Sequence, residues 1–118
     1  MTINVLYVPY ESSERVEVRK ASTLKDYQAM VGGLIESIAM PGCSCFGHDE
    51  AKLAEDWLRT INHRGNTLAR ALKWPGVGVD ILAGNLVFLG IPDGDGNETE
   101  VPDYILALAE RVGVLSDV

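Results

Sequence analysis

Alternating apolar and polar positions near the amino end of the chain predict a β-hairpin. The run 3–8 is rich in β-branched and aromatic residues and stops at Pro9. Val16 and Val18 alternate with charged neighbours, which is typical of a strand exposed on one face. The polar segment 10–14 has the composition of a turn, so we expect two antiparallel strands joined by it.

A capped helix is predicted to follow this hairpin. Ser22 or Thr23 can cap its amino end, and apolar residues recur at helical spacing over 24–31. Gly32 and Gly33 then end the helix, because a left-handed C-cap favours glycine. We expect at least one of these two glycines to have a positive φ and a structural role as a turn.

The middle of the chain is expected to hold one strand among irregular segments. Residues 34–40 are predicted to form a strand, and the small, polar stretch 43–49 a mobile loop. The composition of 50–58 favours a helix, but this segment could equally begin a strand. Residues 62–66 have the composition of a turn, and 67–74 is a single helical turn or an extended arm.

The last third of the chain is predicted to hold a strand and a helix. The run 79–91 resembles a strand in which Gly84 marks a kink or a tight turn. Residues 92–97 form a turn, and 98–101 could continue a hairpin. A final helix opens at residue 102 or 103, where an acidic side chain suits the helix dipole.

These elements place the chain in the α+β class, with a mainly antiparallel sheet, an N-terminal hairpin, one helix after it and a C-terminal helix. The chain has 118 residues, 47% of them hydrophobic, which fits a single domain over 1–118 with a core of its own. The amino end lacks the basic region of a signal peptide, and the apolar runs are too short to cross a bilayer. We therefore expect a cytoplasmic protein.

The net charge of −7 is concentrated at the carboxyl end. Residues 1–90 hold ten acids and nine bases, whereas 91–118 hold seven acids and one base. We call five of these acids the acidic strip: Asp93, Asp95, Glu98, Glu100 and Asp103. Its negative potential repels nucleic acid and membrane phosphates and could attract a basic protein surface. It could also serve only to keep the protein soluble.

Two cysteines and two histidines are the candidate metal ligands. Cys43 and Cys45 are expected to be free thiols, because a disulfide between such close neighbours would be strained. A closed zinc site needs four ligands, so His48 and His63 would both have to take part. We expect no bound metal and no cofactor.

A catalytic role finds little support in the sequence. A nucleophilic Cys–His pair could form from the same four residues, and would make the protein a hydrolase. Nothing in the spacing of these residues selects that arrangement. The chain has neither a Gly-x-Ser-x-Gly elbow nor a glycine-rich phosphate loop. We therefore expect a non-enzymatic protein.

Several short motifs resemble a family of small proteins of unknown function from bacteriophages, plasmids and conjugative elements. They are the paired glycines within 31–36, the turn 61–66, and Asp80-Ile81 followed by glycine and an apolar run to Gly90. The resemblance covers most of residues 3–112. The chain departs from it at the Cys-Ser-Cys insert and at Trp74-Pro75-Gly76.

The resemblance implies an accessory protein of mobile DNA, and two functions remain open. In the first, the acidic strip steers the protein to a basic host protein, such as a defence or regulatory factor. In the second, Arg64, Asn66 and Arg70 line a pocket for a small molecule or a nucleotide signal, because arginine fits phosphate. A homodimer is compatible with either function.

Overall fold

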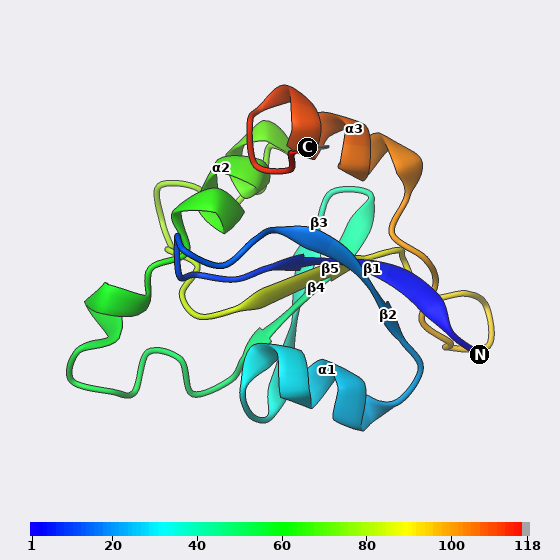
Figure 1. Cartoon of the computed structure of the whole chain (residues 1–118), viewed down its shortest axis with the longest axis horizontal. Helices are drawn as coiled ribbons and strands as arrows, with labels where there is room; N and C mark the ends of the chain where they lie inside the picture. The colour runs from blue at the N-terminus through cyan, green and yellow to red at the C-terminus, as the bar shows by residue number, and fades with distance from the viewer. Residues whose placement is uncertain (117–118) are drawn as a thin grey trace.

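A five-stranded antiparallel sheet lies between two helical layers in the computed structural model, which describes residues 1–116 (Figure 1). The strands are β1 (Ile3–Val8), β2 (Glu17–Ala21), β3 (Ile35–Met40), β4 (Cys43–His48) and β5 (Leu86–Leu89). The helices are α1 (Leu24–Val31), α2 (His63–Ala71) and α3 (Asp103–Arg111), with a short 3₁₀ helix, η1 (Trp57–Thr60). The strand order is β2-β1-β5-β4-β3, which confirms the predicted α+β class with a hairpin first and a helix at each predicted place.

The central strand β5 divides the core into two parts. Leu86 and Phe88 face α2 and α3, and Val87 and Leu89 face α1. All four side chains are buried, because β5 has a strand on either side and helices over both faces. Figure 1 shows α1 on one side of the sheet and the pair α2 and α3 on the other.

The ends of α1 follow the sequence closely. Thr23 is the N-cap: its hydroxyl accepts from the Asp26 amide at 3.3 Å, and the Asp26 carboxylate accepts from the Thr23 amide at 3.0 Å. This reciprocal pair is a capping box. Gly32 ends the helix with φ of +90°, which confirms the expected left-handed cap at one of the two glycines.

The expectation of a mobile loop at 43–49 is wrong. Residues Cys43–His48 form β4, which pairs with β3 on one side and β5 on the other. The Pro41-Gly42 turn reverses the chain directly into this strand. Cysteine packs as a small apolar side chain, so a segment with loop-like composition fills an interior position of the sheet.

The predicted turn at 62–66 is also wrong, because these residues begin α2. Asn62 is the N-cap, and its side-chain oxygen accepts from the Gly65 amide at 2.8 Å. A Cβ at Gly65 would overlap the Leu86 side chain, so glycine lets the helix approach β5 closely. The short helical turn expected over 67–74 is the second half of this longer helix.

Only part of the predicted strand over 79–91 exists. Its second half contains β5, and Gly84, with φ of +78°, forms the turn before it. The first half makes only isolated bridges, from Ala83 to Ile61 and from Asp80 to Val77. Residues 98–101 are not a strand, and 50–58 consist mostly of turns that lead into η1.

Candidate functional site

The turn that carries the first acids of the acidic strip is held by Asp93. One oxygen of its carboxylate accepts from the backbone amides of Asp95 at 2.9 Å and Asn97 at 3.0 Å. These bonds lower the pKa of Asp93, with the Asn97 amide as the largest cause. Asp93 therefore fixes the shape of the turn and leaves the Asp95 side chain exposed to solvent.

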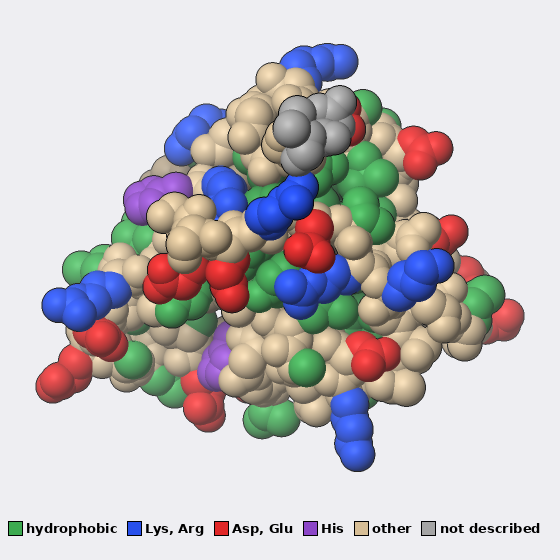
Figure 2. Space-filling view, viewed as in Figure 1, with side chains coloured by type: hydrophobic (Ala, Val, Ile, Leu, Met, Phe, Trp, Pro, Cys, Tyr) green, Lys and Arg blue, Asp and Glu red, His purple; other side chains and the backbone are tan. Residues whose placement is uncertain are grey.

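The other acids of the strip continue from this turn to the start of α3. Glu100 accepts from the Asn4 amide at 2.7 Å and so ties the segment to β1. Glu98 is half-buried near Tyr27, and Asp103 is exposed on the first turn of α3. In Figure 2 acidic side chains lie along the right-hand edge, where Figure 1 places the turn and the start of α3. Within residues 1–116, the carboxylates of Asp95, Glu98 and Asp103 make no hydrogen bond or ion pair.

Arg64 holds the loop of the N-terminal hairpin. Its guanidinium donates to the carbonyl oxygens of Pro9 at 2.8 Å, Glu11 at 2.7 Å and Glu14 at 2.8 Å. The fixed fork of donors in arginine suits such a set of acceptors. The side chain is thus engaged within the fold and does not line the hollow that contains Asn66 and Arg70.

Asn66 and Arg70 do share a hollow of about 450 Å³ at the exposed side of α2. Both ends of the Asn66 side-chain amide are hydrogen-bonded within the fold. Its nitrogen donates to the Leu82 carbonyl at 2.9 Å, and its oxygen accepts from the Leu82 backbone amide at 3.0 Å. Arg70 is exposed at the rim, and the hollow is otherwise mainly apolar, with Val77 and Val79 on its far wall. The structure therefore brings together two of the three predicted ligand-binding residues.

The four candidate metal ligands do not meet. Cys43 and Cys45 are buried in the core between β4 and the α2–α3 layer, while His48 is half-buried at the end of β4 and His63 is exposed at the start of α2. Over the described residues 1–116, no three side chains of the His, Cys, Asp and Glu types gather closely enough to hold a metal ion.

Both cysteines are free thiols, as expected, but they are not accessible. Burial raises the pKa of Cys43 to about 11 and that of Cys45 well above its ordinary value. A thiol nucleophile needs the opposite shift, because the thiolate is the reactive form. The environment of this pair therefore favours a packing role over catalysis.

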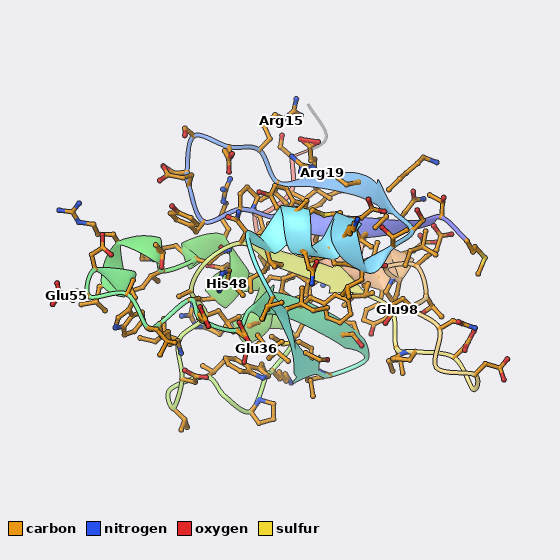
Figure 3. The ribbon with its side chains drawn as sticks, turned by 90° about the horizontal axis from the view of Figure 1, so that it is seen from below. Arg15, Arg19, Glu36, His48, Glu55 and Glu98 are labelled. Carbon is orange, nitrogen blue, oxygen red and sulfur yellow. The ribbon has the colours of Figure 1, made fainter. Side chains whose placement is uncertain are left out.

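A polar cleft beside the edge strand β3 was not predicted from the sequence. Glu36 and Ile38 of β3 form one wall, Asp80 and Ile81 form the other, and the cleft has a volume of about 240 Å³. We call it the β3 cleft. It also contains His48, Asp49 and Lys52. Figure 3 labels Glu36 on β3 and His48 at the end of the neighbouring strand β4.

One ion pair and one hydrogen bond order the walls of the β3 cleft. Lys52 pairs with Asp80, and this hydrogen bond is the largest cause of the lowered pKa of Asp80. His48 accepts from the Glu50 amide through Nδ1 at 3.0 Å, which leaves Nε2 as the protonated nitrogen of the neutral ring. Glu36 and Ile38 are two residues apart, which places both side chains on one face of a strand, and this spacing is the sequence signal for the wall. The approach of Asp80 to the same cleft depends on the fold.

Comparisons with known proteins place the chain in a family without assigning it a function. Neither a curated protein nor a solved structure matches it. No helix within residues 1–116 is long and apolar enough to cross a membrane. One family model, described as "Domain of unknown function (DUF3846)", matches residues 3–112. Because that match spans nearly the whole sequence, the chain belongs to this domain family of unknown function.

Proposed function

We propose that the protein is a non-enzymatic accessory protein of a phage or other mobile element, and that it binds a host protein with a basic surface. One observation carries this proposal: Asp95, Glu98 and Asp103 present unneutralised carboxylates on a segment that the protein itself holds in place. Asp93 orders the turn and Glu100 fastens the segment to β1. Such preorganisation lowers the entropic cost of binding.

The charge of the acidic strip affects the rate of association with a partner more than the strength of the complex. Exposed charges act over a Debye length of about 8–10 Å at physiological salt. A negative surface therefore speeds the encounter with a basic partner, and this acceleration falls as the salt concentration rises. A host factor that binds DNA, whether for defence or for regulation, would carry such a basic surface, because DNA is an anion.

The test reverses only the three carboxylates that make no hydrogen bond or ion pair within residues 1–116. A variant with Asp95→Lys, Glu98→Lys and Asp103→Lys retains Asp93 and Glu100, so the turn keeps its hydrogen bonds. The matched control reverses three exposed acids elsewhere, Glu11, Glu55 and Glu110, and changes the net charge equally. The wild type first captures partners from a bacterial lysate, and each captured protein is then purified for kinetic measurement.

We expect association of the strip variant to be about tenfold slower than that of the wild type at low salt, with a weaker dependence on salt. The control variant should associate nearly as fast as the wild type. Equal rates for the strip and control variants would contradict the proposal, as would a failure to capture any partner. In either case the strip would serve only solubility.

Binding of a nucleotide signal is the second candidate function, and the 450 Å³ hollow beside Arg70 is the observation in its favour. The engagement of Arg64 with three loop carbonyls weakens it, because a phosphate would have to displace those bonds. Calorimetric titration with a set of mono- and dinucleotides tests it directly. Binding that disappears with Arg70→Ala would support this function over the first.

A further inference from the structure

The strand β3 is an open edge of the sheet. The strand order ends at β3, whose one strand neighbour within residues 1–116 is β4. The backbone amide of Asp49 donates to the Leu34 carbonyl at 3.0 Å, so these two residues form a hydrogen-bonded pair at the end of the ladder between β3 and β4. Because these pairs alternate, the backbone of Glu36 and Ile38 faces β4, and that of Ser37 faces outward.

The outward groups of β3 are available to a further strand. The amides and carbonyls of Ile35, Ser37 and Ala39 point away from β4 by this alternation. The Ser37 and Ala39 side chains are small and exposed, so they leave the backbone open to approach. Proline, lysine and arginine, which natural proteins use to block sheet edges, do not occur in this strand.

The opposite edge of the sheet is protected in the usual way. The strand β2 carries Arg19 and Lys20, both exposed, and Arg19 pairs with Glu17 and stacks on the Tyr7 ring. Charged side chains of this kind discourage an added strand. The contrast between the two edges points to β3 as the one that accepts a partner.

The β3 cleft lies on the same face as the Glu36 and Ile38 side chains. An added strand would place every second side chain on this face, because the side-chain period of a strand is two. The cleft carries three carboxylates, those of Glu36, Asp49 and Asp80, against one amine, that of Lys52, which already pairs with Asp80. Its charge therefore suits a lysine or arginine side chain, whose apolar stem could lie against Ile38.

We infer that an extended, basic segment of a partner protein adds to β3 as a sixth strand and inserts a lysine or arginine into the β3 cleft. Main-chain hydrogen bonds to the outward groups of β3 would supply affinity, and the cleft would supply specificity. The inference rests on the proposed function in that the partner is basic, but it assigns a surface other than the acidic strip. A second copy fits poorly, since antiparallel pairing of two β3 strands would bring the two acidic clefts together.

Selection from a library of random peptides of about twelve residues, a length that covers one strand, tests this inference. We expect enriched peptides to alternate β-branched with other residues and to carry lysine or arginine on one face. When an enriched peptide is added to the ¹⁵N-labelled protein, the amides of Ser37 and Ala39 should shift and become protected from exchange. Enriched peptides without a basic residue, or no enrichment, would overturn the inference.

Two variants locate the site. Glu36→Lys reverses the charge of an exposed wall residue and should weaken peptide binding at least about tenfold. Ser37→Pro removes one outward donor without removing a bond to β4 and should weaken binding similarly. Glu55→Lys is the matched charge control and should bind the peptide like the wild type. Should Ser37→Pro fail to fold, Glu36→Lys still decides the outcome.

The remaining outcomes separate this site from the acidic strip and from self-association. The strip variant with three lysines should bind the peptide normally, and loss of binding there would assign the peptide to the strip instead. Slow association of a host protein with the strip variant, together with normal peptide binding, would leave both proposals standing. Sedimentation that shows a dimer abolished by Ser37→Pro would make a second copy the occupant and overturn the inference.

Discussion

The side-chain amide of Asn62 donates a 2.8 Å hydrogen bond to the carbonyl oxygen of Val8, at the end of β1. The same nitrogen donates to the Gly84 carbonyl at 2.9 Å, and the side-chain oxygen caps α2 through the Gly65 amide. Asn62 is fully buried. One side chain thus joins a strand end, a helix start and the turn before β5.

Replacement of Asn62 by alanine should destabilise the protein strongly. The change removes three hydrogen bonds and leaves two carbonyls and one amide buried without their partner, at a cost of at least about 2 kcal/mol. Urea denaturation should show this as a lower midpoint. Thr67→Ala is the control, because its hydroxyl bonds only to the His63 carbonyl of its own helix and should cost well under about 1 kcal/mol. Equal midpoints for the two variants would contradict the assigned role.

Arg64→Lys tests whether this arginine holds the hairpin loop. A lysine cannot reach the carbonyls of Pro9, Glu11 and Glu14 together, because it lacks the fixed fork of donors. Hydrogen exchange should therefore become faster over residues 10–15, with β5 unaffected. Arg70→Lys is the control and should leave the loop unchanged. Unchanged exchange in the loop of Arg64→Lys would return Arg64 to the candidates for ligand binding.

The elements that depend on residues close together in the sequence were predicted correctly. The hairpin pattern, the Thr23 cap, the Gly32 terminus and the final helix are correct because each depends on neighbours in the sequence. The strand β4 was missed because its place depends on β3 and β5, which lie on either side of it. Its cysteine, serine and glycine residues give no strand signal of their own.

The helix α2 was missed for a similar reason. Asparagine, glycine and threonine have low helix propensity, and the contacts that override it come from Leu68 and Ala69, buried against the sheet. The β3 cleft could not be predicted, since Glu36 and Asp80 are distant in the chain. The acidic strip was visible in the sequence because charge can be counted without knowledge of the fold.

The glycine pair after α1 should contribute to stability and not to binding. Gly32 has φ of +90°, and alanine there should cost about 1–2 kcal/mol. A Cβ at Gly33 would overlap the His48 imidazole, so the ring would have to move. We expect the double alanine variant to unfold at lower urea concentration and its folded fraction to bind partners normally. Gly94→Ala is the control, since a Cβ there meets no atom within 4 Å. Loss of binding with unchanged stability would instead make this turn a contact site.

Thiol chemistry should report the burial of Cys43 and Cys45. Both side chains are below 5% exposed, so a thiol reagent should react slowly with the native protein and rapidly with both thiols in denaturant. Fast native reaction of both would restore the mobile loop that the sequence suggested. The same burial raises both thiol pKa values, so the stability of the folded protein should depend on pH.

The stability of the folded protein should fall as the pH rises from about 9 to about 11. Over this range the unfolded chain loses its thiol protons, whereas the folded protein keeps them until the pH reaches the raised pKa of Cys43. Unfolding therefore releases protons, and the free energy of unfolding decreases by at most about 1.4 kcal/mol per pH unit for each thiol. The stabilising contribution is complete below pH 9 and is lost as the pH rises through the folded pKa.

The variant with Cys43→Ala and Cys45→Ala isolates this effect. Tyr7 and Tyr27 also have raised pKa values, but neither shift depends on a cysteine, so their contribution cancels in the difference. The pKa of Tyr104 is raised mainly by burial and further by Cys43, so only the part due to burial cancels. Urea denaturation at a series of pH values should give a constant difference in stability below pH 9 and a shrinking advantage of the wild type above it. A difference that stays constant up to pH 11 would show that the thiols titrate as they do in the unfolded chain, and so that β4 does not bury them.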